Sequence, residues 1–173
     1  MNISSADLRT IMPQAKQSNI DAFVQPINDT CDEFKINTPQ RQAAFLAQIA
    51  HESGQLRYSE ELASGEAYEG RKDLGNTLSG DGVRYKGRGL IQITGKENYA
   101  RCGSALGVDL LAEPERLKEP ELAARSAGWF WFTHGCNELA DADDFQRITR
   151  RINGGLNGYD DRVAFWERAK EVA

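Results

Sequence analysis

The chain has 173 residues, with 21 Lys and Arg against 26 Asp and Glu, and a formal net charge of −5 at pH 7. This length suits one domain, and 40% hydrophobic with 27% charged residues is typical of a globular protein rather than a disordered chain or a disulfide-stapled miniprotein. Neither half of the sequence carries the excess of Lys and Arg that a nucleic-acid-binding surface needs, so we expect no nucleic-acid partner.

The sequence also indicates where the protein is made. No apolar run approaches the roughly 20 residues that span a bilayer. The N-terminal residues MNISSADLRT have neither the charged n-region nor the apolar h-region of a signal peptide. We therefore expect no signal peptide, no stable membrane insertion and a cytoplasmic site of synthesis. Cys31, Cys102 and Cys136 form an odd set without CxxC spacing, which predicts reduced, mostly buried thiols.

Most of the chain carries helix signals, and one central stretch does not. Capping residues, prolines and apolar spacing predict helices over 5–12, 18–36, 39–53, from about 96 to 107, after Pro120, and over about 143–152 and 160–172. Residues 65–89 are rich in Gly, Asp, Asn and Ser, which favours a loop, with 83–85 and 90–94 as two short strands about a turn. The prediction is a mainly α (α+β) fold, a single domain over 1–173, with a small β-hairpin beside the active-site cleft.

Two acidic residues form the candidate catalytic pair. In the predicted helix 39–53, Glu52 follows Phe45 and Ile49 on one face, so its carboxylate sits where an apolar stripe meets a loop. Apolar surroundings disfavour the charged form of a carboxylate, as a general acid requires. Nine residues on, Glu61 lies among polar residues where it can stay ionised. Two carboxylates in unlike environments are the minimum for glycoside hydrolysis, although spacing alone favours Glu61 as a surface acid.

Three ordered motifs carry a family resemblance. AFLAQIAHESG (44–54), GDGVRYKGRGLIQITGKENY (80–99) and INGGLNG (152–158) together resemble the catalytic domain of glycoside hydrolase family 19, the chitinase-like enzymes, and specifically its phage-endolysin branch. The resemblance runs from about residue 41 to 166. It implies a lysozyme-like α-rich fold, an inverting mechanism and cleavage of β-1,4 bonds next to N-acetylated aminosugars, with no metal or organic cofactor.

The resemblance also implies roles for individual residues. Glu52 falls on the general acid of the H-E-[ST]-G motif, and Glu61 on the downstream general base, with the neighbouring Glu60 as the alternative. Thr94 falls on the hydroxyl that helps to hold the nucleophilic water. The positions implied to bind substrate are His51, Tyr85, Gln92, Asn98, Tyr99, Asn153 and Arg162, the last being a late Arg near the acid.

One departure from the family pattern bears on the cleft. Many relatives carry a long helical insertion between the second Glu and the Y-x-G-R-G segment, whereas 23 residues separate Glu61 from Tyr85 here. We therefore expect a cleft that is more open on that side, with an undetermined number of sugar subsites.

Other motifs favour structural interpretations. His51-Glu52 lacks the second His of H-E-x-x-H because Gln55 stands there, which argues against a zinc site. The four aromatic residues 129–132 point all round a helix, so core burial is the default for at least two of them. The arginines at 147, 150 and 151 favour a solvated helix face over a cell-wall contact.

The sequence thus predicts a monomeric endolysin that binds peptidoglycan glycan strands and cleaves between N-acetylmuramic acid and N-acetylglucosamine. It has no room for a separate cell-wall-binding domain beside the motifs. It would collect in the host cytoplasm and reach the periplasm and cell wall during lysis. The alternatives are a chitinase acting on N-acetylglucosamine polymers and a non-catalytic cell-wall-binding module.

Overall fold

The computed structural model describes residues 2–173 and is mainly helical. Its α-helices are, in chain order, α1 (Ser5–Ile11), α2 (Gln17–Glu33), α3 (Pro39–Glu52), α4 (Asp81–Arg84), α5 (Lys96–Leu106), α6 (Pro120–Thr133), α7 (Cys136–Asp141), α8 (Phe145–Asn153) and α9 (Tyr159–Val172). Three short 3₁₀ helices are η1 (Glu66–Tyr68), η2 (Lys72–Leu74) and η3 (Pro114–Lys118). The predicted helices are confirmed to within about three residues at their ends, whereas α7 and the short α4 were not predicted. Within residues 2–173 no helix is both long and apolar enough to cross a bilayer.

Local chemistry fixes both ends of α3, the helix that ends at Glu52. The Thr38 side chain accepts a hydrogen bond from the Arg41 N–H, and Pro39 occupies the first turn, where its missing N–H costs nothing. At the other end Ser53 caps the helix and Gly54 takes a left-handed φ of 57°. The helix therefore stops directly after Glu52 and leaves this carboxylate at its end.

The larger hydrophobic core surrounds α3. Helix α9 packs along α3, and α1, α2, α6, α7 and α8 contribute the other buried apolar side chains. Trp131 of α6 is fully buried and meets Phe45 of α3 edge-on, with ring centroids 5.3 Å apart. Helices α2 and α6 cross closely at Gly128, because a Cβ there would overlap the side chains of Thr30 and Phe34.

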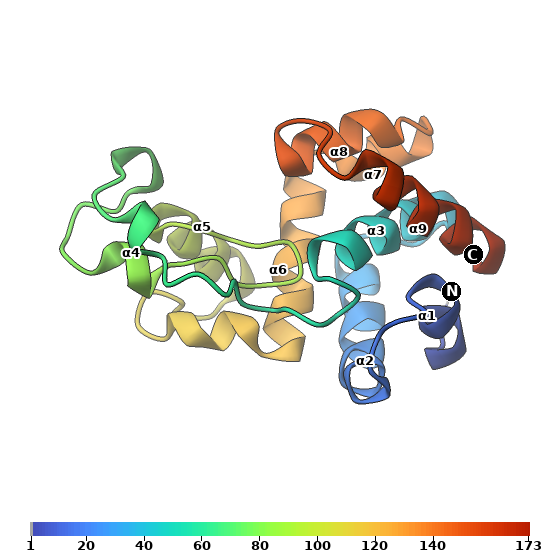
Figure 1. Cartoon of the computed structure of the whole chain (residues 1–173), viewed down its shortest axis with the longest axis horizontal. Helices are drawn as coiled ribbons and strands as arrows, with labels where there is room; N and C mark the ends of the chain where they lie inside the picture. The colour runs from blue at the N-terminus through green and yellow to red at the C-terminus, as the bar shows by residue number, and fades with distance from the viewer. Residues whose placement is uncertain (1) are drawn as a thin grey trace.

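A second, smaller core lies in the other part of the molecule. It joins Tyr85, Ile93 and residues of α5 to the segment around η3 and to Leu122 of α6. Figure 1 shows α6 standing between this part and the group formed by α1, α2, α3, α8 and α9. The expectation of a single core is therefore corrected to two buried clusters that both pack against α6.

The predicted β-hairpin is reduced to isolated bridges. Residues 83 and 84 belong to α4 and Tyr85 caps it, so the strand predicted over 83–85 is wrong. The reason is tertiary packing: at Gly82 a Cβ would come within 2.5 Å of the Glu69 backbone nitrogen, and this close approach to a neighbouring loop favours a helical turn over an extended strand. What remains is centred on Arg88, which bridges antiparallel to both Glu60 and Ile93.

Candidate active site

The candidate acid Glu52 is paired with Arg162. Arg162 Nη1 lies 2.7 Å from Glu52 Oε1, and the Arg162 side chain is 2% exposed against 23% for Glu52. Glu52 ends α3 and Arg162 belongs to the first turns of α9, the helix that packs along α3. The extensive α3–α9 contact therefore brings together two charges that lie 110 residues apart in the chain.

Arg162 is itself held by several acceptors. Its Nη1 also donates to Gln48 Oε1 at 2.7 Å, and its Nε donates to the Asn157 carbonyl at 3.1 Å. The Gln48 amide donates in turn to Thr149 Oγ1 at 3.0 Å. This buried polar chain leaves Arg162 one orientation, because each donor and acceptor in it is already engaged. The apolar setting expected for Glu52 is corrected: a buried guanidinium stands beside its carboxylate.

His51 is fixed next to the acid. Its Nδ1 lies 2.7 Å from Asp161 Oδ2, and a Cβ on Gly158 would overlap its ring. The start of α9 therefore clamps the imidazole from two sides. The side chain stays partly exposed, which is compatible with the predicted contact to substrate.

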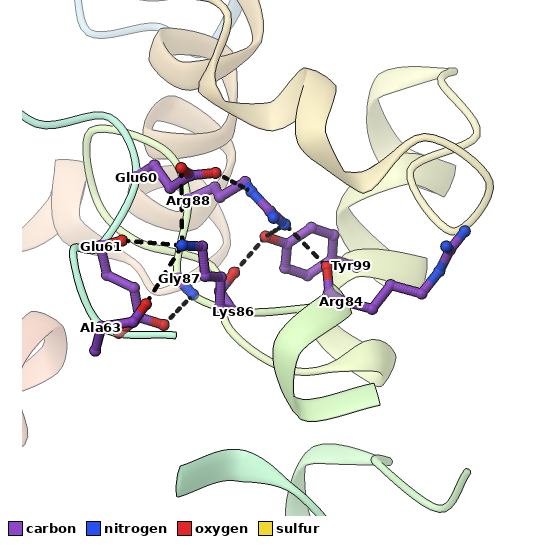
Figure 2. A network of polar contacts seen from close by, with 8 residues as sticks. All are labelled: Glu60, Glu61, Ala63, Arg84, Lys86, Gly87, Arg88 and Tyr99. Atoms are coloured by element: carbon purple, nitrogen blue, oxygen red, sulfur yellow. Dashed lines mark hydrogen bonds and ion pairs between the residues drawn. The ribbon is translucent and has the colours of Figure 1, made fainter. Parts of the chain in front are cut away.

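The candidate base Glu61 has both carboxylate oxygens bound. Its Oε1 accepts from the Gly87 N–H at 2.6 Å and its Oε2 accepts from the Tyr68 hydroxyl at 3.0 Å. The Glu61 N–H donates back to the Gly87 carbonyl at 2.9 Å. These contacts fix the carboxylate against the segment that contains the Y-x-G-R-G motif, as Figure 2 shows.

The neighbouring Glu60 belongs to a different network. Its Oε2 accepts from Arg88 Nε at 2.7 Å, and Lys86 Nζ lies 3.7 Å from its other oxygen. Burial alone would raise the pKa of Glu60, but the hydrogen bond from Arg88 and the charges of Lys86 and Arg88 outweigh it and hold the pKa below its usual value. Glu60 is therefore committed to an ion pair with a buried arginine (Figure 2), which favours Glu61 as the carboxylate available to a water.

Three predicted site residues converge on Gly87. A Cβ on this glycine would lie 2.6 Å from Gln92 Oε1 and 3.2 Å from Thr94 Oγ1, and its N–H already contacts Glu61. Asn98 follows on the first turn of α5, where its amide donates to the Thr94 carbonyl at 2.8 Å. The absence of a side chain at position 87 is what lets an amide, a hydroxyl and a carboxylate approach one another here.

These residues border a hollow of about 220 Å³ that sequence reasoning missed in part. Gln92, Thr94 and Asn98 form one wall, and Trp129, Phe130 and His134 at the end of α6 form the other. Of the four aromatic residues at 129–132 only Trp131 is in the buried class, so the prediction that at least two would be buried is wrong. Helical spacing holds the signal: Trp131 continues the buried face of Ala124 and Ala127, whereas Trp129 lies off it.

Two predicted substrate contacts are corrected. Tyr99 is fully buried and its hydroxyl is bound by Arg88 and the Lys86 carbonyl, while Tyr85 packs edge-on against it and donates to the Leu111 carbonyl at 3.1 Å. Neither side chain is free to meet a sugar. Both instead support the segment 86–88 that carries Glu61 and Gly87 (Figure 2).

Asn153 stands apart from both carboxylates in sequence and ends α8, where Gly154 takes a left-handed φ of 81°. Its amide is half-buried, and its contact with a sugar stays a prediction. The three cysteines are free and buried, and burial raises the pKa of each thiol to about 12. Among residues 2–173 no group of three or more His, Cys, Asp or Glu side chains is arranged to hold a metal ion.

Sequence comparisons agree on one family. The family model described as Chitinase class I (Glyco_hydro_19) matches residues 18–145. A Haemophilus influenzae protein named as glycosyl hydrolase family 19 domain-containing is 36% identical over 198 residues, covering 96% of this chain and 94% of its own length. An endochitinase of Arabidopsis thaliana is 39% identical over 126 residues, covering 72% of this chain and 43% of its own. The chain thus spans less than half of that plant relative.

Solved structures share the fold. Chitinase C from Streptomyces griseus superposes with a TM-score of 0.78 at 23% identity, covering 98% of this chain and 76% of its own. A bacterial family 19 chitinase superposes with a TM-score of 0.79 at 24% identity, covering 98% of this chain and 94% of its own.

Proposed function

This chain belongs to glycoside hydrolase family 19 and is a chitinase-like glycoside hydrolase, and within that family we propose that it is an endolysin. Its substrate is the glycan of bacterial peptidoglycan, cut at the β-1,4 bonds between N-acetylmuramic acid and N-acetylglucosamine. Hydrolysis inverts the anomeric centre and serves lysis of a host cell.

Glu52 and Glu61 divide the chemistry in this proposal. Glu52 protonates the glycosidic oxygen as the bond breaks, and the negative charge that develops on its carboxylate is stabilised by Arg162 at 2.7 Å. Glu61 takes a proton from a water that attacks the opposite face of the sugar. An inverting enzyme needs roughly 6.5–9.5 Å between the two carboxyl groups to fit this water. The end of a helix and a separate loop can provide that gap.

Thr94 and its neighbours complete the proposed site. The Thr94 hydroxyl faces the same glycine as Glu61, and a hydroxyl can both donate to and accept from a water. Gln92 and Asn98 border the adjoining hollow with Trp129. Amide side chains and an aromatic wall suit the hydroxyl, acetamido and apolar faces of an aminosugar.

The observation that carries peptidoglycan as the substrate is the short connection between Glu61 and Tyr85. Peptidoglycan differs from chitin in the stem peptides on its muramic acid residues, and these need room beside the cleft. The alignment with endochitinase 2 of Gossypium hirsutum extends over 171 positions although it takes in 75% of this chain. That relative therefore carries internal segments that this chain lacks, which supports a more open cleft here.

Chitin is the second candidate substrate, because several curated relatives are named endochitinases. A non-catalytic wall-binding module is the alternative of another class. The bound and oriented carboxylates of Glu52 and Glu61 support an enzyme over such a module. As an endolysin the protein would act as a monomer, collect in the host cytoplasm and reach the periplasm and cell wall during lysis, without nucleic-acid partners or stable membrane insertion.

Digestion of both substrates tests the proposal. Purified peptidoglycan and chitin oligomers are incubated in parallel, and released fragments are identified by mass spectrometry. We expect muropeptides with a new reducing N-acetylmuramic acid, and slow or no cleavage of chitin oligomers. Cleavage of chitin alone would assign the chain to the chitinases, and binding to peptidoglycan without released sugar would support the wall-binding module.

A further inference from the structure

We propose that Tyr68 is a positioning residue for Glu61, which it orients for attack by water. The inference rests on the proposed role of Glu61 as the base. Tyr68 lies on η1, in the central loop for which the sequence predicted no functional residue.

The contact leaves Glu61 competent as a base. A carboxylate offers about four acceptor positions, and the Gly87 N–H and the Tyr68 hydroxyl occupy one on each oxygen, at 2.6 and 3.0 Å. Rotation of the carboxylate would break one of the two bonds. The remaining acceptor positions therefore keep a fixed direction toward a water beside Thr94.

A buried amide holds Tyr68 in place. The Asn76 side chain is fully buried; it donates to the Tyr68 carbonyl at 2.9 Å and accepts from the Lys96 N–H at 2.9 Å. Lys96 begins α5 two residues after Thr94. The same amide thus ties the residue that holds the base to the segment that carries the proposed water ligand.

The docking of this loop is close-packed. A Cβ on Gly75 would lie 2.9 Å from the Glu97 Cβ, and one on Gly95 would lie 2.7 Å from the Leu74 Cβ. The segment from η1 to η2 therefore sits directly on the start of α5. Tyr68 has little freedom to leave Glu61.

The hydrogen bond has a defined effect on protonation. Burial, followed by the bond to Glu61, raises the pKa of Tyr68, so its hydroxyl is a neutral donor across the working pH range. Donation stabilises the charged form of Glu61, and its loss favours the protonated form. The other ionisable groups around Glu61 are Glu60, Lys86 and Arg88 on the adjoining segments, Tyr99 on α5, and Arg71 near Tyr68; none of them changes in the test below.

The test compares Tyr68→Phe with wild type on peptidoglycan fragments. We expect kcat to fall about 10- to 100-fold, because a misplaced catalytic group is costly, with KM within twofold and an unchanged melting temperature. The acid limb of the kcat/KM profile should move to higher pH by about half a unit to one unit. The matched control is Tyr159→Phe, since the Tyr159 ring packs against Phe145 at 6.2 Å and has no place in the proposed chemistry.

A second variant gives the opposite shift. Replacing Tyr68 by 3-fluorotyrosine keeps the ring and hydroxyl but makes a stronger donor, so the acid limb should move to lower pH. Unchanged kcat and pH profiles in both variants, or a rise in KM alone, would overturn the inference. If wild type cleaves neither peptidoglycan nor chitin, the proposed function fails. If Glu61→Gln is inactive while Tyr68→Phe matches wild type, only the role of Tyr68 fails.

Discussion

Arg162 reaches Glu52 from a helix that begins 107 residues after α3 ends, and their charged atoms lie 2.7 Å apart. The guanidinium is almost fully buried and the carboxylate is partly open. A general acid must give up its proton during bond cleavage, and the negative charge that remains then meets a fixed cation. The pair therefore suits an acid whose charged product, rather than its resting form, needs stabilisation.

The first prediction concerns this pair. Glu52→Gln should lower activity on peptidoglycan by at least about 100-fold, because the proton donor is lost. It should also lower the free energy of unfolding by about 1–3 kcal/mol, because Arg162 loses its counter-charge while staying buried. Urea denaturation and turnover assays measure the two effects.

Glu33→Gln provides the matched control for Glu52→Gln. Glu33 pairs with Arg125 at 2.8 Å on the surface, with 38% of its side chain exposed. The same chemical change should cost less than about 1 kcal/mol there and leave turnover intact. Near wild-type turnover in Glu52→Gln would remove Glu52 from the mechanism.

The sequence predicted the acid's position because local rules set it. Thr38, Pro39 and Gly54 mark the ends of α3, and these three residues alone are enough to place Glu52 at a helix end. The partners of the site come from distant segments: Tyr68 reaches Glu61 through the packing of a loop on α5, and Trp129 reaches Thr94 across the hollow. No local periodicity encodes such contacts.

The error over 83–85 has the same origin. Val, Arg and Tyr favour a strand locally, but Gly82 is pressed against another loop and the chain turns helically instead. Tyr85 and Tyr99 belong to a motif that resembles family sugar-binding positions, yet their burial supports the loop beneath Glu61. Motif matching locates the site but does not separate side chains that contact substrate from those that hold up its floor.

The second prediction separates Glu60 from Glu61. Glu61→Gln should lower kcat by about 100-fold or more with little change in melting temperature, because an amide cannot accept the proton of water. Glu60→Gln should keep most activity but lower the free energy of unfolding by about 1–2 kcal/mol, because it weakens the bond to buried Arg88. The reverse pattern, with Glu60→Gln inactive and Glu61→Gln active, would move the base by one residue.

The third prediction concerns stability against pH. The folded protein holds the pKa of Glu60 below its ordinary value of 4.5, so the unfolded chain binds a proton at this residue more readily. The contribution of Glu60 to stability is therefore complete above about pH 4.5 and is lost as the pH falls through the lower folded value. Urea midpoints measured from pH 7 to pH 3 should fall more steeply for wild type than for Glu60→Gln. Parallel curves would contradict the ion pair with Arg88.

The last prediction tests the hollow at the end of α6. Trp129 borders it opposite Gln92 and Asn98, whereas Phe132 on the same helix is 46% exposed and lies against Phe34, with ring centroids 6.1 Å apart. If the hollow binds a sugar ring, Trp129→Ala removes its aromatic wall and should raise KM for peptidoglycan fragments about 10-fold, since loss of such a contact costs about 1–2 kcal/mol.

Phe132→Ala is the control for Trp129→Ala, because it deletes an aromatic ring of the same helix outside the hollow. It should leave KM within twofold of wild type. Both variants should keep near wild-type circular dichroism, since neither ring is in the buried class. Equal effects of the two changes on KM would mean that α6 influences binding through stability alone, and that the sugar lies elsewhere along the segment from Gly87 to Asn98.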